Sequence, residues 1–239
     1  MKLNTFALSD IGLKRKINQD AYLKDDATGL FIVADGMGGH RGGEVASQLA
    51  VEVIQQFCRQ NLELAPRDCL DKAVNLSCQE IYKQSMANEE LSGMGTTVLA
   101  MLFRDDSVYI AQVGDSRAYL LQTGKIWQIT EDHSLLNEEI RAGRVAAGQA
   151  ANYQFKNVIT RSVGYENHVT VDIYRRQAQV GDMFLLCTDG LSGLVSSHEM
   201  VDEVKKAGPD GALKNLVGLA NSRGGDDNIT VLLCHVAAL

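Results

Sequence analysis

The chain of 239 residues has few prolines and lacks the sequence features of domain linkers, membrane spans and secretory signals. It contains only two prolines, and no stretch rich in proline, glycine or serine is typical of a linker between domains. We therefore expect one domain over residues 1–239. No apolar run is long enough to cross a bilayer, and residues 1–10 lack the apolar segment of a secretory signal. The expected location is the cytoplasm, without attachment to a membrane.

The cysteines and the basic residues exclude further classes of protein. The five cysteines are odd in number and include no C-x-x-C pair, which is typical of reduced thiols and not of a disulfide framework or a zinc site. The net charge is −7, and lysine and arginine form no stripe that could follow a nucleic-acid backbone. We expect no nucleic acid among the partners. Nothing in the sequence requires a dimer, so a monomer is expected.

The order of the predicted elements favours a layered α+β fold. Runs of β-branched and apolar residues predict strands over 30–34, 97–103, 108–113, 118–122, 169–175, 183–187 and 228–236. Helical periodicity covers 43–61, 66–86, 197–207 and 211–222. Helices in adjacent pairs do not match the strand–helix alternation of a doubly wound fold, so we expect antiparallel sheets in a sandwich flanked by helices. Residues 134–157 are rich in small side chains and predict a mobile flap.

Aspartates recur at the ends of the predicted strands, each beside glycine or another turn residue. They are Asp20, Asp35, Asp115, Asp189 and Asp227. Any one of them alone is more typical of a turn than of a functional site. Their recurrence indicates a shared site, because carboxylates on rigid strand ends next to glycine build an oxygen-lined metal cage. Oxygen ligands favour Mg²⁺ or Mn²⁺ over zinc or copper.

Separated blocks of sequence occur in the order in which one enzyme family has them. They are Arg15 with Asn18-Gln19-Asp20, Ala34-Asp35-Gly36-Met37-Gly38-Gly39-His40, Gly95-Thr96-Thr97, Val113-Gly114-Asp115-Ser116-Arg117, Asp132-His133-Ser134, Cys187-Thr188-Asp189-Gly190 and Gly225-Asp226-Asp227-Asn228-Ile229-Thr230. On these blocks, which span nearly the whole chain, the sequence resembles the bacterial branch of the PP2C-type (PPM) protein phosphatases. The resemblance implies a four-layer α/β/β/α fold: a central sandwich of two antiparallel β-sheets flanked by helix pairs, with a flap near the metal site.

The resemblance also implies an activity, a cofactor and a set of ligands. The activity is metal-dependent hydrolysis of phosphoserine and phosphothreonine in proteins by a metal-activated water, opposing a bacterial Ser/Thr kinase. The cofactor is two Mg²⁺ or Mn²⁺ ions, with room for a weaker third. The implied ligands of the first two ions are Asp20, which acts mainly through water, Asp35, which bridges both, the Gly36 carbonyl, Asp189 and Asp227. Asp115, together with Asp189, matches the position for the third ion.

Two further residues match positions that handle the phosphate in that family. Arg15 matches an arginine that grips the phosphate, a role that suits a planar fork of donors. Apart from the motif, it would be a solvated charge in a basic run. His40 matches a histidine that protonates the departing serine or threonine oxygen. Alone, a histidine in a glycine-rich loop is more typical of the surface. With Asp35 they form the expected catalytic set, whereas His133 is expected to support the flap.

Two other functions stay open at this point. A non-catalytic regulator on the same fold would bind phosphoproteins without cleaving them, and its expected signature is a missing ligand; all five aspartates are present. A hydrolase of small phosphoesters would differ in its turnover of phosphopeptides and nucleotides. A covalent route is not expected, because no cysteine begins a C-x₅-R loop and no D-x-D signature occurs. Relatives often have His-Pro where this chain reads Asn152-Tyr153, so substrate preference and affinity for the third ion also stay open.

Overall fold

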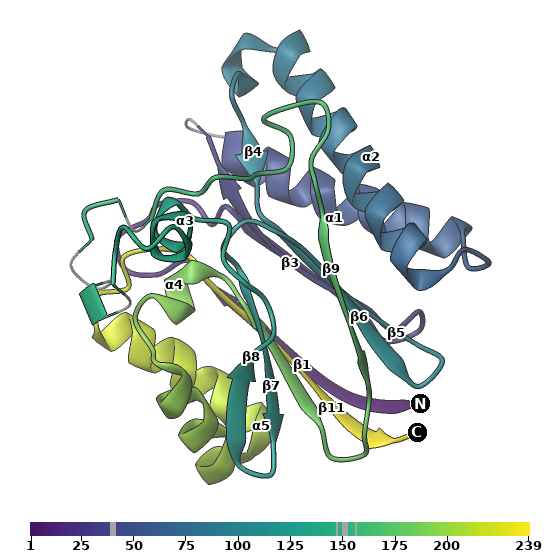
Figure 1. Ribbon diagram of the computed structural model, residues 1–239, viewed down its shortest axis with the longest axis vertical. Helices are drawn as coiled ribbons and strands as arrows, with labels where there is room; N and C mark the ends of the chain where they lie inside the picture. The colour runs from purple at the N-terminus through teal and green to yellow at the C-terminus, as the bar shows by residue number, and fades with distance from the viewer. Residues whose placement is uncertain (39–41, 147, 150–152, 156) are drawn as a thin grey trace.

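The computed structural model describes residues 1–38, 42–146, 148–149, 153–155 and 157–239 and shows a layered α+β fold (Figure 1). One sheet has the order β1 (Lys2–Asp10), β11 (Ile229–Ala238), β10 (Met183–Cys187), β7 (Arg117–Gln122) and β8 (Lys125–Gln128). The other has the order β2 (Asp20–Asp25), β3 (Leu30–Met37), β5 (Val98–Arg104), β6 (Ser107–Val113) and β9 (Asp172–Gln177), with β4 (Gly95–Thr96) paired to β3. The described strand pairs are antiparallel. The predicted pair of antiparallel sheets is confirmed.

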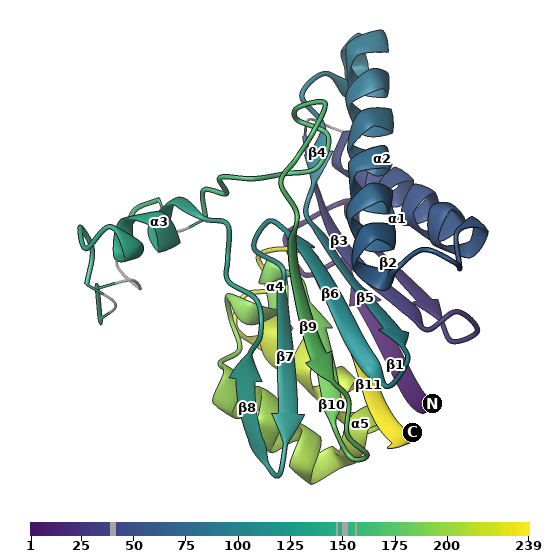
Figure 2. The same ribbon diagram turned by 45° about the vertical axis from the view of Figure 1, so that its right-hand side comes forward.

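Helices cover the outer face of each sheet, as Figure 1 shows. α1 (Gly42–Gln60) and α2 (Pro66–Ala87) pack on the sheet that contains β3, whereas α4 (Asp189–Ser192) and α5 (Ser197–Ser222) pack on the sheet that contains β10. α5 is interrupted at Gly208, which has a φ of 68° and precedes Pro209, so it comprises the two helices expected from the sequence. The short η1 (Glu89–Leu91) follows α2, and α3 (Leu135–Arg141) stands away from the sandwich in Figure 2.

Alternation along the central strands divides the apolar core into three layers. In β5, Leu102 packs toward α1 and α2, whereas its neighbour Met101 packs between the sheets. Successive side chains of a strand point to opposite faces, so a strand that is buried on both faces is apolar throughout. Phe103 lies edge-on to Phe31 and Phe184, with ring centroids 5.9 and 5.6 Å apart, and thereby joins the sheets. Each such fully buried large side chain contributes about 1.5–3 kcal/mol.

Several elements were not predicted from the sequence. β1 is an edge strand that is mostly half-buried, so polar residues interrupt its apolar pattern. α3 has no buried residue, and its seven residues are too few to show helical periodicity; the Ser134 side chain caps it by accepting the Asn137 N–H at 3.3 Å. The segment expected to be an irregular flap thus begins with a helix. Residues 147, 150–152 and 156 of that segment lie outside the described residues.

The cysteines lie in the packed layers. All five are buried free thiols. Cys58 on α1 and Cys69 on α2 share a thiol hydrogen bond with 3.6 Å between the sulfur atoms, which adds to the packing between these helices. Among the residues that the structure describes, no helix is both long and apolar enough to pass through a bilayer.

Candidate metal centre

The β2–β3 pair contributes two aspartates to one end of the sandwich. Asp20, the first residue of β2, is paired with Asp35 on β3. The Asp35 N–H donates to Thr97 Oγ1 at 2.9 Å, and its carbonyl accepts the Thr96 hydroxyl at 2.9 Å and the Thr97 N–H at 2.8 Å. Thr97 Oγ1 also shares a 2.8 Å hydrogen bond with Ser116 Oγ, which ties β3 to the β6–β7 turn. These hydroxyls fix the backbone that carries Asp35.

The other sheet contributes Asp189 and Asp227. Asp189 is the first residue of α4, just past β10, and Asp227 precedes β11, which pairs with β10. Asp227 Oδ1 accepts the Asn228 N–H at 2.8 Å, and its Oδ2 accepts Arg15 Nη2 at 2.7 Å. Gly190 admits no side chain, because a Cβ there would lie 1.9 Å from the Asn228 carbonyl oxygen. The two carboxylates are therefore held on closely packed backbone.

A chain of hydroxyl groups connects Asp20 to the second sheet. Thr188 Oγ1 donates to Asp20 Oδ2 at 2.9 Å and accepts the Thr230 N–H at 3.0 Å. Thr230 Oγ1 shares a 2.8 Å hydrogen bond with Ser9 Oγ, which accepts the Asn18 amide at 2.9 Å. One oxygen of Asp20 is thus held by hydroxyls. The other, Oδ1, is buried and has no hydrogen-bond partner among the described residues.

Burial and mutual repulsion raise the pKa of Asp20, Asp35, Asp115 and Asp189 and so disfavour their charged forms. Burial raises the pKa of Asp20 to about 7, and the charges of Asp189 and Asp227 add to this. Burial and then Asp189 raise the pKa of Asp115 to about 7. The pKa of Asp35 lies well above its ordinary value because the group is buried and faces the other four aspartates. Two unit charges about 4 Å apart repel by roughly 4 kcal/mol at an effective dielectric of about 20, so the charged cluster needs cations.

The donors suit divalent cations, although the side chains as placed do not form a coordination shell. In the described part of the chain, no group of three or more histidine, cysteine or acidic side chains is positioned to hold a metal ion. Yet Asp20 Oδ1 and Asp189 Oδ1 are buried without a partner there, whereas buried polar atoms are normally paired. Buried, unpartnered carboxylate oxygens fit Mg²⁺ or Mn²⁺.

Gly36 follows Asp35 where β3 approaches the start of α1. A Cβ at Gly36 would lie 1.9 Å from the Gly43 carbonyl oxygen and 2.6 Å from that of Gln19. Its N–H donates to the Gln19 carbonyl at 3.1 Å, which joins β3 to the residue before β2. Only glycine permits this close approach. The placement beside Asp35 is observed, and the role of the Gly36 carbonyl as a ligand stays a prediction.

The structure describes one of the two residues predicted to handle the phosphate. The half-exposed Arg15 lies at the rim of the carboxylates, in an ion pair with Asp227. His40 lies outside the described residues. The roles expected for Arg15 and His40 therefore stay predictions.

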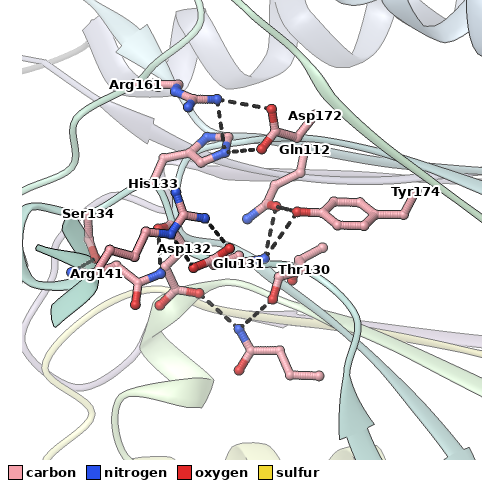
Figure 3. A network of polar contacts seen from close by, with 12 residues as sticks. Gln112, Thr130, Glu131, Asp132, His133, Ser134, Arg141, Arg161, Asp172 and Tyr174 are labelled. Carbon is pink, nitrogen blue, oxygen red and sulfur yellow. Dashed lines mark hydrogen bonds and ion pairs between the residues drawn. The ribbon is translucent and has the colours of Figure 1, made fainter. Parts of the chain in front are cut away.

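A polar network beside Asp115 anchors the segment that leads into α3 (Figure 3). The Gly114 N–H donates to His133 Nδ1 at 3.1 Å, so Nε2 carries the ring proton and donates to Asp172 at 3.1 Å. Burial lowers the pKa of His133, which favours this neutral form. Arg161 also donates to Asp172 at 3.1 Å. His133 thus links the turn before Asp115 to β9, in keeping with the supporting role expected for it.

Sequence reasoning assigned no role to two residues that organise the site. Thr188 is the only described side chain from β10 or its end that bonds to Asp20, at 2.9 Å. The Asn228 side chain donates to the carbonyls of Ile11 and Ile17 at 2.9 and 3.1 Å and accepts the Gln19 N–H at 2.8 Å. Both lie next to a predicted ligand in the sequence. A hydroxyl or amide beside an acid at a strand end was the available signal.

The fold and the site define a class: an α/β/β/α protein that brings carboxylates from both sheets together at one end of the sandwich. The family model for protein phosphatase 2C matches residues 14–209, and the chain belongs to this family. The chain is 40% identical to the serine/threonine phosphatase Stp of Listeria welshimeri over 233 aligned residues. The alignment covers 94% of this chain and 92% of that protein.

Solved structures agree with this assignment. The crystal structure of the Mycobacterium tuberculosis serine/threonine phosphatase PstP/Ppp matches with a TM-score of 0.93 at 33% identity and covers 99% of both chains. A structure of the PstP catalytic domain in complex with two manganese ions matches with a TM-score of 0.90 at 34% identity and covers 99% of both chains. The four-layer fold that the resemblance implied is confirmed.

Proposed function

We propose that this protein hydrolyses phosphoserine and phosphothreonine in proteins, with divalent cations held by its five aspartates. The observation that carries the proposal is the proximity of these five carboxylates at one end of the sandwich, where the buried Oδ1 atoms of Asp20 and Asp189 have no hydrogen-bond partner among the described residues. Membership of the protein phosphatase 2C family supports it. The two manganese ions of the related PstP structure support Mn²⁺ or Mg²⁺ as the cofactor.

The proposed ligands fall into two sets according to the ions that they would hold. Those of the two core ions are Asp20, Asp35, the Gly36 carbonyl, Asp189 and Asp227. Asp115, together with Asp189, would hold a third ion. When bound, the ions supply Lewis-acid stabilisation and a water activated near neutral pH. Thr188 holds one oxygen of Asp20, which would leave the other oxygen available as a ligand. The carboxylates of both sheets keep the site at a fixed place on rigid strand ends.

Two side chains act on the phosphoester in this proposal. Arg15, at the rim, presents a planar guanidinium that takes two phosphate oxygens at once. His40 donates a proton to the serine or threonine oxygen as it leaves. No side chain of the chain is proposed as a nucleophile.

The setting of the reaction is also proposed. Residues 1–239 form one domain, with residues 134–157 as a flap beside the site, and the protein acts as a monomer. Its substrates are phosphoproteins, so a cognate Ser/Thr kinase acts in the same compartment. The cytoplasm is proposed as that compartment, and the five buried free thiols support it because thiols stay reduced there.

A metal-dependent assay tests the proposal. A phosphothreonine peptide is expected to release phosphate with Mn²⁺ or Mg²⁺ and not after EDTA. Turnover of nucleotides should be much lower than that of the peptide. Asp227→Asn should lower kcat by at least about 100-fold, because several kcal/mol of transition-state stabilisation depend on a held ion. The matched control is Asp226→Asn, an exposed neighbour, which should retain turnover of p-nitrophenyl phosphate. Hydrolysis that survives chelation, or equal loss in both variants, contradicts the proposal.

A further inference from the structure

The loop between β1 and β2 exposes both apolar and basic side chains. Ile11, Leu13 and Ile17 have 39%, 67% and 39% of their surface exposed. Between Leu13 and Ile17 lie Lys14, Arg15 and Lys16, the one run of three consecutive basic residues in the sequence. The chain as a whole has a net charge of −7, so this run is a local exception to its acidic composition. We call residues 11–17 the basic loop.

The basic loop is held in place by backbone hydrogen bonds. The Leu13 and Lys14 N–H groups donate to the Gly225 carbonyl at 2.8 and 3.2 Å. The Asn228 side chain donates to the carbonyls of Ile11 and Ile17 at 2.9 and 3.1 Å. The backbone of the loop is therefore fixed. When a partner binds, only the side chains of the loop remain to be ordered, which lowers the entropic cost of binding.

The basic loop adjoins the candidate metal centre. Arg15 Nη2 lies 2.7 Å from Asp227 Oδ2, so the loop reaches the rim of the carboxylates. Lys14 pairs with Asp226 Oδ1 at 2.5 Å, and both side chains are more than half exposed. Lys16 makes no ion pair with any residue that the structure describes. The loop thus offers Lys16 and three apolar side chains to whatever lies beside a bound phosphoester.

We propose that the basic loop is a docking surface for the substrate chain next to the phosphorylated residue, and that it selects segments with acidic and apolar side chains. The proposal rests on the phosphatase function proposed above. Charge complementarity with Lys16 identifies the acidic part of the occupant. Leu13, Ile11 and Ile17, which are exposed on the same loop as the basic residues, identify the apolar part, since apolar side chains beside charged ones are typical of protein-binding surfaces.

Matched phosphopeptides test the docking surface. Three phosphothreonine peptides of equal length carry glutamate and leucine, alanine only, or lysine and serine beside the phosphorylated residue. The wild-type protein should cleave the glutamate–leucine peptide with a kcat/KM about 10-fold above that of the lysine–serine peptide. Lys16→Glu should lower the ratio of the two kcat/KM values by a few-fold, mainly through a higher KM for the glutamate–leucine peptide. The effect is small because an exposed ion pair is weak. Leu13→Ser should lower kcat/KM for the same peptide by about 5-fold, because apolar contact area is lost.

Control variants distinguish docking from a general change in charge or folding. Lys2→Glu makes the same charge change at the far end of β1, and Leu62→Ser removes an apolar side chain that is 54% exposed near the far end of β5. Neither should alter the preference. All four variants should hydrolyse p-nitrophenyl phosphate like the wild type, because that substrate has no flanking chain.

The outcomes distinguish failure of the docking proposal from failure of the proposed phosphatase function. If the wild-type protein cleaves all three peptides equally, or if Lys16→Glu and Leu13→Ser leave the preference intact, the docking proposal is wrong and the phosphatase function stands. If p-nitrophenyl phosphate and all peptides resist the metal-loaded protein, the phosphatase function itself is wrong. The docking surface is supported if the KM for the glutamate–leucine peptide rises in both loop variants and not in the two control variants.

Discussion

The two ends of β2 carry buried aspartates with opposite surroundings. Asp25, at one end, accepts hydrogen bonds from Arg59 Nε at 3.0 Å and from the Thr28 N–H at 3.4 Å. Burial opposes its charge, but these bonds outweigh burial and lower its pKa. Asp20, at the other end, has hydroxyls and further acids around it, and burial raises its pKa to about 7. Asp25 thus has a protein cation beside it, whereas Asp20 has none among the described residues and is suited to a bound ion.

The largest expected difference between the two ends concerns catalysis. Asp35→Asn, opposite Asp20, should lower kcat on p-nitrophenyl phosphate by about 1,000-fold, since several kcal/mol of charge stabilisation are lost. Asp25→Asn should leave kcat per folded molecule unchanged and lower the free energy of unfolding by about 1 kcal/mol, because Arg59 is half-exposed. Steady-state kinetics and urea unfolding of both variants measure this. Equal losses of activity would remove the distinction between the two ends.

The hydrogen bond from Thr188 to Asp20 is the next feature to test. Thr188→Val keeps the shape of the side chain and removes the hydroxyl, so the affinity for Mn²⁺ should fall by about 10- to 100-fold. Thr188→Ser keeps the hydroxyl and should retain most of the affinity. Isothermal titration with Mn²⁺ measures both. A similar affinity in the valine variant would show that Thr188 serves the fold and not the ions.

Bound ions should stabilise the acidic end specifically. An ion at about 100 times its Kd stabilises the folded state by about 2.7 kcal/mol, which corresponds to a rise in Tm of about 5–10 °C for a domain of this size. The rise should persist in Asp25→Asn and shrink in Asp189→Asn. Thermal unfolding with EDTA or with Mn²⁺ provides the comparison. An equal rise in both variants would place the ions elsewhere.

The pH dependence of the chelated protein should be the smallest effect. The pKa of Asp20 and of Asp115 is raised to about 7 by burial. Between about pH 4 and 7 the folded chain keeps these protons whereas the unfolded chain loses them, so the stability they contribute is present at low pH and lost as pH rises through 7. The Tm should therefore fall by a few degrees between about pH 5.5 and 8. The Tm of the Asp20→Asn variant should fall less over the same pH range. A fall of the same size in that variant would contradict the raised pKa of Asp20 as the cause.

The elements that sequence patterns predicted share strong burial. β3, β5 and β10 are almost wholly buried and apolar, so their runs stood out. β1 and α3 were missed because their residues are half-buried or exposed and their stability comes from pairing with β11 or from a cap. The candidate ligands were found because each follows or precedes such a run. A hydroxyl or amide beside an acid marked Thr188 and Asn228 as candidates, but their partners could not be predicted, since these contacts join positions far apart in the chain.

The sequence by itself determined the alternation that buries the strands and the aspartates at their ends, because both are local properties of neighbouring residues. Only the tertiary structure decided which of the buried aspartates has a cation. Arg59 comes from α1 to reach Asp25, whereas Asp20 meets Thr188 of the opposite sheet and the charges of Asp189 and Asp227. The physical reason is that the pKa of a buried carboxylate depends on all the groups that surround it in space.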